Sequence, residues 1–146
     1  FTYRNHEGKR KSVERDGLIS LGDVGYMKEG RLYLCDRRSD MVIFGGTNIY
    51  PAEIEMVLTQ CPGVKDCAVF GIPDDDFGES LAAAVERMPE SQVTPEEIRS
   101  YLLERLAKFK VPKRIDFHES LPREDSGKIF KRRLRDPFWQ NAGRKI

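Results

Sequence analysis

Two segments of the chain place their apolar residues at helical spacing, and each starts with a proline that suits the first turn of a helix. The first begins at Pro51 and is stopped by Pro62-Gly63, and the second opens on the capping box Thr94-Pro95-Glu96-Glu97 and runs until Pro112. Their apolar stripes are Ile54, Val57, Leu58 and Cys61 in the first segment, and Ile98, Tyr101, Leu102, Leu106 and Phe109 in the second. The pattern predicts two amphipathic helices.

Short apolar runs between and after these helices predict strands, at Met41–Phe44, Val64–Ile72, Leu81–Val85 and Arg114–His118. Gly45-Gly46 ends the first run with a turn that glycine forms at little cost. A polar loop over Pro122–Ser126 leads to a last short helix over Ile129–Arg135. The order predicts an α+β unit over about residues 40–136, built from a short hairpin and a three-stranded sheet flanked by helices.

The first 38 residues lack helical periodicity. Asp16-Gly17 and Glu29-Gly30 are turn signals that separate the short apolar runs Leu18-Ile19 and Arg31–Cys35. This segment therefore reads as strands joined in hairpins. It holds too few apolar residues to build a core of its own, so we expect it to pack against something else.

The composition describes a charge-rich globular chain, since 39% of the 146 residues are hydrophobic and 34% are charged. Every apolar run is far shorter than a membrane span, so we expect no transmembrane segment. The first residues show no basic-then-apolar signal pattern, which makes the cytoplasm the expected compartment.

Cysteine and histidine provide no obvious chemistry. Cys35, Cys61 and Cys67 are too few and too irregularly spaced for a disulfide framework or a zinc site. His6 and His118 stand in no nucleophile–base or metal-ligand pattern, so both read as surface or core residues. The run of aspartates at 74–76 lacks the alternating spacing of a calcium loop. We therefore expect no metal site.

The near-neutral net charge of +1 conceals a basic C-terminal part, where residues from Arg123 onward include eight Lys or Arg against three Asp or Glu. The run Lys128–Arg135 has the look of a nucleic-acid or targeting patch. A solvated helix face is the commoner explanation for such a run. A site for a phosphate-bearing small ligand is the third possibility.

Three local patterns are candidates for chemistry. In Gly22-Asp23-Val-Gly25 a carboxylate sits in a glycine-flanked turn, and as a pure hydrogen-bond acceptor it suits the vicinal diol of a ribose. In Asp36-Arg37-Arg38-Ser39-Asp40, followed by Gly45-Gly46, arginine can grip phosphates or sugar hydroxyls and the glycines allow close approach of a ligand. Taken alone, an ordinary turn is the commoner explanation for the first pattern and a charged hairpin for the second.

The third pattern is Pro122-Arg-Glu-Asp-Ser-Gly127-Lys128. It is not a Walker A loop, because the first glycine is absent and Ile129 replaces the Ser or Thr that follows the lysine. What remains is a lysine on a glycine loop, which can deliver a positive charge to developing negative charge. A solvent-exposed lysine without function is the alternative.

The order and spacing of these patterns resemble the adenylate-forming superfamily, and specifically its acyl-CoA synthetases, from about residue 16 to 135. The motifs that carry the resemblance are Gly22-Asp23-Val-Gly25-Tyr26, Asp36-Arg37-x-x-Asp40 through Gly45-Gly46 to Pro51-x-Glu53, Val69-x-Gly71-Ile-Pro73-Asp74, Lys110-Val-Pro112, and Leu121-Pro122-x4-Gly127-Lys128. In this family a carboxylate reacts with ATP to give an acyl-adenylate, and coenzyme A then displaces AMP.

The resemblance implies that residues 1–38 are the last strands of a larger, absent N-terminal domain and that 39–146 are the C-terminal lid domain. Such a piece is expected to be inactive alone and to work with that domain, magnesium-bound ATP, a carboxylic acid such as a long-chain fatty acid, and coenzyme A. No tightly bound cofactor and no nucleic acid are expected.

The resemblance also assigns roles to seven residues. Asp23 matches the aspartate that binds the ribose hydroxyls, and Arg37 matches the arginine that holds ribose and phosphate. Lys128 matches the adenylation lysine, and Gly45 with Gly46 match the loop that shapes the coenzyme A channel. The hinge falls at Ser39 and Asp40.

Two positions depart from the family pattern. The hinge position Ser39 is usually Asp or Lys in this family, although serine can also absorb a backbone rotation. Asn48 stands in the region where some relatives carry arginines that contact phosphate, and those arginines are absent here. The resemblance also loosely assigns the basic run Lys131–Arg135 to the phosphates of coenzyme A. Two other functions remain open: loading of a carrier protein in place of coenzyme A, and a free-standing basic module that binds nucleic acid.

Overall fold

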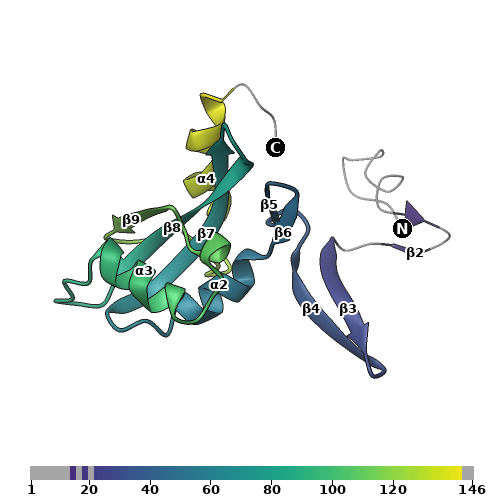
Figure 1. The fold of residues 1–146 in the computed structure, drawn as a ribbon, viewed down its shortest axis with the longest axis horizontal. Coiled ribbons are helices and arrows are strands. Elements are labelled where there is room, and N and C mark those ends of the chain that lie inside the picture. The colour runs from purple at the N-terminus through teal and green to yellow at the C-terminus, as the bar shows by residue number, and fades with distance from the viewer. Residues whose placement is uncertain (1–13, 16–17, 20–21, 143–146) are drawn as a thin grey trace. The chain divides into compact units, whose positions relative to one another are not determined.

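The computed structural model describes residues 14–15, 18–19 and 22–142. It divides the chain into two compact units, Phe1–Ser39 and Asp40–Ile146 (Figure 1). The predicted turn at Asp16-Gly17 and the histidine at position 6 lie outside the described residues.

The first unit consists of antiparallel hairpins. β1 (Glu14–Arg15) pairs with β2 (Leu18–Ile19), and β3 (Asp23–Lys28) pairs with β4 (Arg31–Arg37). The predicted turn at Glu29-Gly30 is present, with φ of 51° and 74°, which are the left-handed values that a two-residue turn between twisted strands requires. None of residues 22–39 is buried, in agreement with the expectation that this segment has no core of its own.

The second unit is built on a five-stranded sheet with the order β6-β5-β8-β7 and with β9 added to β8. Its strands are β5 (Val42–Phe44), β6 (Thr47–Ile49), β7 (Val64–Asp74), β8 (Gly78–Arg87) and β9 (Arg114–His118). The predicted short hairpin, β5–β6, joins the three other strands through the single pair Phe44–Gly78. β9 runs parallel to β8, and the other pairs are antiparallel. The predicted α+β class is confirmed.

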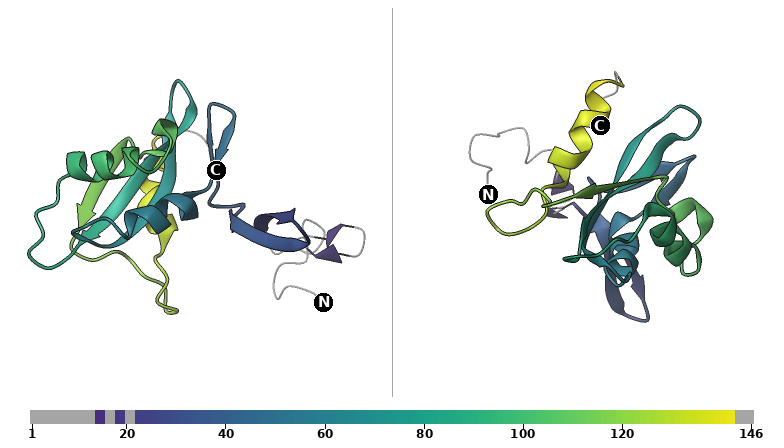
Figure 2. Two further views of the ribbon diagram at one scale, coloured as in Figure 1. Left: turned by 60° about the horizontal axis from the view of Figure 1, so that its bottom comes forward. Right: turned by 90° about the vertical axis from the view of Figure 1, so that its left-hand side faces the viewer.

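Helices cover both faces of this sheet (Figures 1 and 2). α2 (Pro51–Leu58) and α3 (Pro95–Leu103) pack on one face, where their buried side chains join Leu81, Ala83 and Val85 of β8. α4 (Lys131–Gln140) packs on the other face, where Leu134 meets Ala82 and Ala84. Because successive residues of a strand point to opposite faces, a strand covered on both sides becomes a continuous apolar run.

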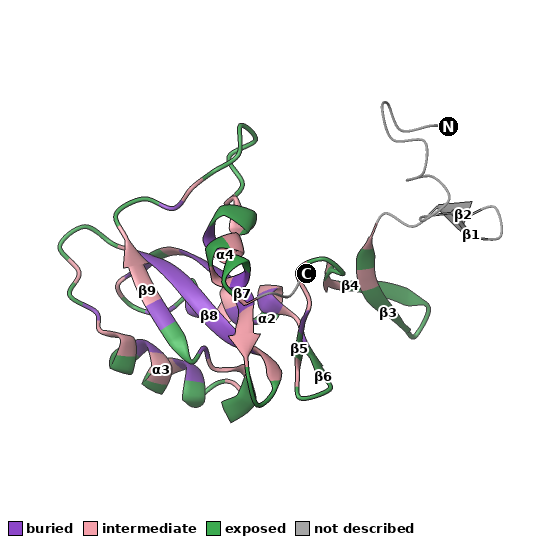
Figure 3. Ribbon diagram, turned by 90° about the horizontal axis from the view of Figure 1, so that it is seen from above, coloured by how far each residue is buried: buried purple, intermediate pink, exposed green. Residues whose placement is uncertain are grey.

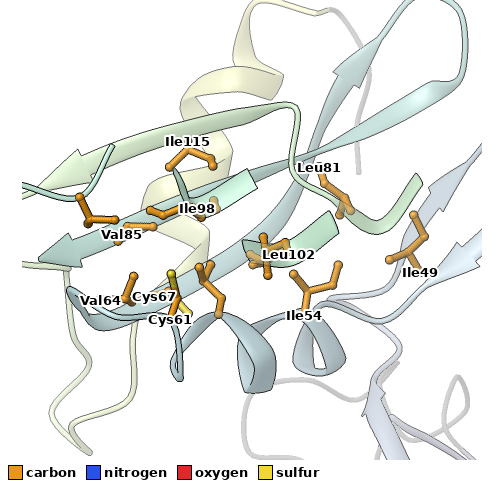
Figure 4. Close-up of a cluster of buried hydrophobic side chains, with 14 of the residues drawn as sticks. Ile49, Ile54, Cys61, Val64, Cys67, Leu81, Val85, Ile98, Leu102 and Ile115 are labelled. Atoms are coloured by element: carbon orange, nitrogen blue, oxygen red, sulfur yellow. The ribbon is translucent and has the colours of Figure 1, made fainter. Parts of the chain in front are cut away.

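The main core lies between the sheet and α2 and α3 (Figure 4). Ile54 and Leu58 of α2 and Ile98 and Leu102 of α3 are fully buried in it, as the predicted stripes require. Figure 3 shows the central strands as largely buried, whereas β3 and β4 are largely exposed. Burial of a Leu or Ile side chain stabilises a fold by roughly 1.5–3 kcal/mol, so this core is the main source of stability of the second unit.

The end of α3 differs from the prediction. The helix ends at Leu103, and a 3₁₀ turn, η1 (Lys108–Lys110), follows in place of the expected helical turns through Phe109. The backbone becomes extended at Ala107, with φ −59° and ψ 144°. This break lets Leu106 pack against the core and lets Lys110 reach Glu53 of α2, with 2.9 Å between Nζ and Oε2.

The last helix is longer than the predicted segment that ends at Arg135. α4 continues to Gln140 through Pro137, although a proline inside a helix removes one backbone hydrogen bond. Beyond the proline, the buried Trp139 fastens the end of the helix to the sheet, because its Nε1 donates to the carbonyl oxygen of Gly71 in β7 at 3.0 Å.

Candidate functional site

The register of the β3–β4 hairpin brings the two candidate nucleotide residues together. Asp23 and Arg37 are directly opposite partners at the end of the hairpin that lies away from its turn, and both are exposed. Directly opposite residues of antiparallel strands project from the same face. The end of the ladder is closed by the amide of Arg38, which donates to the carbonyl oxygen of Gly22 at 2.7 Å.

A bulge in β3 follows this pair, between Val24 and Gly25. A Cβ added at Gly25 would lie only 2.5 Å from the carbonyl oxygen of Tyr33, so glycine is required where the two strands approach. The glycine of the motif therefore has a structural reason that is independent of any ligand. The candidate hinge residues lie at the boundary of the two units, with Ser39 as the last residue of the first and Asp40 as the first of the second.

The turn between β5 and β6, which we call the glycine loop, consists of Gly45 and Gly46 with φ of 53° and 83°. The amide of Gly45 donates to the carbonyl oxygen of Phe77 at 2.9 Å. The ring of Phe77 stacks on that of Phe44, with 4.4 Å between ring centroids. A Cβ at Gly45 would meet Phe77 at 3.2 Å, whereas a Cβ at Gly46 would meet no atom within 4 Å.

The turn between β7 and β8 holds Phe77 in place. The carboxylate of Asp74 accepts hydrogen bonds from the amides of Phe77 and Asp76 at 3.1 and 3.0 Å. These two hydrogen bonds lower the pKa of Asp74, and the bond from Phe77 contributes most. The run of aspartates therefore builds a turn, and among the described residues no cluster of His, Cys, Asp or Glu is arranged to hold a metal ion.

A cavity of about 220 Å³ lies beside the glycine loop. Its lining combines aromatic rings and basic side chains with one carboxylate: Phe44, Phe77, Phe109, Lys108, Lys113 and Asp74. Lys113 Nζ lies 3.3 Å from Oδ2 of that aspartate. Phe77 and Phe109 are 48% and 41% exposed, so their rings are open to a ligand. Stacking surfaces beside ammonium groups suit a planar base that carries phosphate.

Lys128 lies in the connection between β9 and α4, in the exposed segment Arg123–Lys128, which we call the lysine loop. The loop folds back on itself, because the amide of Glu124 donates to the carbonyl oxygen of Lys128 at 2.8 Å and the amide of Gly127 donates to that of Glu124 at 2.9 Å. Gly127 has a φ of 88°, the left-handed conformation that glycine adopts without strain.

Charged groups tie the lysine loop to the sheet. Arg123 Nη2 lies 2.6 Å from Oδ2 of Asp66 in β7, and Nη1 donates to the carbonyl oxygen of Gly127 at 3.0 Å. The hydrogen bond to Asp66 raises the pKa of Arg123. Just before the loop, the amide of Leu121 donates to Oε2 of Glu86 at 3.3 Å.

Glu86 is itself a buried carboxylate with a partner. Its Oε1 accepts a hydrogen bond from Lys65 Nζ at 2.9 Å. This bond, assisted by the amide of Leu121 and opposed by burial, lowers the pKa of Glu86. The base of the lysine loop thus rests on an ionised group.

Lys128 borders a groove of about 490 Å³ between α2, β7 and the start of α4. Lys131 and Glu55 form an ion pair in its wall, at 2.6 Å, and Glu55 also accepts from the amide of Val69 at 2.8 Å. Cys67 lines the groove, but burial raises the pKa of this thiol to about 12, so it is not a nucleophile near neutral pH.

The structure does not bring the glycine loop and the lysine loop together. Figure 2 (left) shows the tip of the β5–β6 hairpin and the connection between β9 and α4 at opposite ends of the second unit. One body therefore presents two distinct chemical surfaces, one without side chains and one with an exposed ammonium group.

Sequence reasoning missed the residues that hold these loops. Arg123 was read only as part of a polar loop, and Phe77 had no role. The signal for Arg123 is its place inside the motif that ends in Gly127-Lys128, but its partner Asp66 is 57 positions away. No local pattern identifies such a pair.

With this geometry in hand, comparison with known proteins decides the family. The sequence profile described as "AMP-binding enzyme C-terminal domain" matches residues 53–128, more than half of the chain. This chain belongs to that family. The match includes Lys128 and the helices and strands that support it, and it confirms the resemblance to adenylate-forming enzymes.

Two similar proteins are ligases. The fatty acid–[acyl-carrier-protein] ligase ScoC of Streptomyces coeruleorubidus is 45% identical over 132 residues, which are 90% of this chain and 25% of that protein. The 2-succinylbenzoate–CoA ligase of Bacillus cereus strain Q1 is 47% identical over 134 residues, 91% of this chain and 27% of that protein. The chain thus spans about a quarter of the length of these relatives.

A solved structure shares the fold. The crystal structure of ATP-bound MatB from Rhodopseudomonas palustris matches with a TM-score of 0.85 and 39% identity, over 94% of this chain and 28% of that one. Over the part of the chain that the structure describes, no helix is long and apolar enough to cross a membrane.

Proposed function

We propose that this chain is the C-terminal part of an AMP-forming acyl-CoA ligase. Residues 1–38 are the end of a large N-terminal domain, and residues 39–146 are the lid domain that moves on it about Ser39 and Asp40. The intact enzyme takes magnesium-bound ATP, a carboxylic acid and coenzyme A. Family membership and the names of the relatives, which join acids to coenzyme A or to a carrier protein, support this proposal.

The observation that carries the proposal is the presentation of Lys128. Its side chain is exposed on a glycine turn whose backbone is tied to the sheet. In the first half-reaction a carboxylate attacks the α-phosphate of ATP, and both reactants are anions. An ammonium group placed between them lowers their repulsion and stabilises the charge that develops in the transition state.

Asp23 and Arg37 are proposed to bind the nucleotide. Their opposite positions across the β3–β4 ladder present an acceptor for ribose hydroxyls beside a donor for ribose or phosphate oxygens. One ligand with a diol and a phosphate can therefore engage both side chains at once.

The glycine loop is proposed to shape the channel for the pantetheine arm of coenzyme A in the second half-reaction. The absence of side chains at Gly45 and Gly46 leaves room for a narrow, flexible chain. The adjoining cavity, with its exposed Phe77 and Phe109 and with Lys108 and Lys113, suits the adenine and phosphates at the other end of that molecule. The run Lys131–Arg135 is a second, more loosely assigned site for these phosphates. Lys131 is paired with Glu55 there, as Lys113 is paired with Asp74 in the cavity.

The test is Lys128→Ala in the full-length protein that carries this chain. We expect the rate of acyl-adenylate formation, measured by ATP–pyrophosphate exchange, to fall at least about 100-fold. This is the usual effect of removing a group that stabilises transition-state charge. Thioester formation from supplied acyl-adenylate should be nearly unchanged. Equal loss in both half-reactions would reject the assignment of Lys128.

A second candidate function is the loading of a carrier protein. The 45% identity to a fatty acid–[acyl-carrier-protein] ligase supports it. The acceptor is decided by supplying the adenylated enzyme with coenzyme A or with a phosphopantetheinylated carrier protein. Transfer to the protein alone would replace the coenzyme A assignment, and a parallel screen of fatty acids and 2-succinylbenzoate identifies the acid.

A further inference from the structure

We propose that Arg123 is a positioning residue for Lys128, acting as a two-ended clamp between the lysine loop and Asp66 of β7. The inference rests on the proposed role of Lys128 in adenylation. It assigns to a neighbouring arginine the task of fixing where the ammonium group stands.

The need for a clamp follows from the loop itself. Residues 123–128 are all exposed, so little packing holds them. Gly127, directly before the lysine, has no atom within 4 Å of a Cβ built on it. The bonds of Glu124 to Lys128 and of Gly127 to Glu124 are internal to the loop. At the base of the loop the backbone of Arg123 bridges to that of Ile129, whose side chain packs against the core. None of these contacts ties the carbonyl of Gly127 to the sheet.

Arg123 supplies the missing connection. One nitrogen of its guanidinium donates to the carbonyl oxygen of Gly127 at 3.0 Å, which is one peptide unit from Lys128. Another binds the carboxylate of Asp66 at 2.6 Å. A planar, permanently charged group with donors in fixed directions restrains both partners at once, which a flexible ammonium does less well.

The anchor on β7 is itself fixed. The second carboxylate oxygen, Oδ1, of Asp66 accepts a hydrogen bond from the amide of Cys67 at 2.9 Å. Cys67 is buried in the core, and the Asp66 side chain is only 30% exposed. The side chain of Arg123 thus connects the carbonyl group of Gly127 to a fixed point of the sheet.

The consequence concerns turnover and not substrate binding. Released from the clamp, the loop samples positions in which the ammonium is displaced from the carboxylate and the α-phosphate. A misplacement of about 1 Å can cost on the order of 100-fold in rate. Binding of ATP by the rest of the enzyme has no such dependence on the loop.

The experiment compares Arg123→Met with Arg114→Met in the full-length enzyme. Arg114 forms an exposed pair with Asp116 at 2.7 Å on β9, so its replacement removes a similar ion pair away from the lysine loop. For Arg123→Met we expect the adenylation kcat to fall roughly 10- to 100-fold. The KM for ATP, thioester formation from supplied acyl-adenylate and the melting temperature should match those of Arg114→Met. Asp66→Asn, which keeps the shape of the anchor, should show a smaller loss of the same kind.

A second cycle places Arg123→Met in the Lys128→Ala enzyme. If Arg123 acts through the lysine, it should not lower the residual adenylation further. An equal additional loss in this background, an equal loss of thioester formation, or behaviour like that of Arg114→Met would overturn the clamp and leave the role of Lys128 intact. Normal adenylation by Lys128→Ala would instead overturn the proposed function, and the clamp with it.

Discussion

The glycine loop and the lysine loop belong to the same unit but are held by different forces. The tip of the glycine loop is held by a backbone hydrogen bond from Gly45 to Phe77 and by the stack of Phe77 on Phe44. The lysine loop is held by the charged pair of Arg123 and Asp66 and rests on the ionised Glu86. The first support comes from the neighbouring turn, and the second reaches across to a distant strand.

This difference matches what each loop has to present. In the proposed function the glycine loop has to be free of side chains, because a narrow chain must pass over it. Phe77 of the neighbouring turn therefore holds the loop in place of a side chain of its own. A surface that delivers a positive charge needs a defined direction, and charged hydrogen bonds with fixed geometry provide it. The two loops can therefore be perturbed separately.

Among variants of the glycine loop and its supports, the largest effect is expected from Gly46→Val. A β-branched side chain at a φ of 83° is strained and projects into the proposed channel. Thioester formation from supplied acyl-adenylate should fall at least about tenfold, while ATP–pyrophosphate exchange stays within twofold or so of the wild type. Stopped-flow measurement of each half-reaction checks this.

Gly30→Val is the matched control, because Gly30 has a φ of 74° and open space around its Cβ, but lies in the tip of the β3–β4 hairpin. It introduces the same kind of backbone strain in a different hairpin of the chain. A similar loss in both variants would show that strain and not obstruction is responsible.

A smaller effect is expected from Phe77→Leu, which keeps an apolar side chain but removes the ring stack. An aromatic pair contributes roughly 0.5–1.5 kcal/mol beyond its buried area. A loss of about 0.5–1 kcal/mol corresponds to a two- to fivefold slower thioester step. Phe109→Leu, in the same cavity but outside the stack of Phe77 on Phe44, should raise the KM for coenzyme A and leave kcat unchanged. If both variants behave alike, the support role of Phe77 is wrong.

The smallest effect is a change in the pH dependence of stability for Glu86→Gln. Because hydrogen bonds from Lys65 and Leu121 lower the pKa of Glu86 in the folded state, the unfolded chain binds more protons at this position. The carboxylate therefore stabilises the fold above its ordinary pKa of 4.5, and this contribution disappears as the pH falls through the lowered value.

Urea unfolding of the 146-residue chain at pH 7 and at steps below pH 5 measures this effect. The variant should be less stable at pH 7 and should lose less stability on acidification than the wild type. Glu104→Gln, which removes an exposed carboxylate at the end of α3, is the control for the loss of one negative charge. Parallel slopes for wild type and Glu86→Gln would contradict the prediction.

Local signals in the sequence were sufficient for most of the second unit. Thr94 caps α3 as the capping box predicts, with its side chain accepting from the amide of Glu97 at 3.2 Å. Pro51 and Pro95 start their helices, and the apolar stripes pack into the core except at Phe109, which is exposed. These features depend on residues within four positions of one another, which is the range that periodicity and capping describe.

Features that depend on distant partners were not predictable in the same way. The break in the helix at Ala107 is explained by two distant contacts. Leu106 packs against the core, and Lys110 forms an ion pair with Glu53. The pairing of Asp23 with Arg37 depends on strand register, and the parallel position of β9 depends on the whole sheet. Motif order pointed to Lys128, but only the fold shows what holds it.

The ion pair between Arg123 and Asp66 also has a consequence for how the protein is made. Its partners are 57 positions apart, so closing this contact requires the intervening chain, with β8, α3 and β9, to be in place first. During synthesis the strand that carries Asp66 emerges before the lysine loop does. We therefore expect a nascent chain to form its central sheet before the lysine loop is fixed in place.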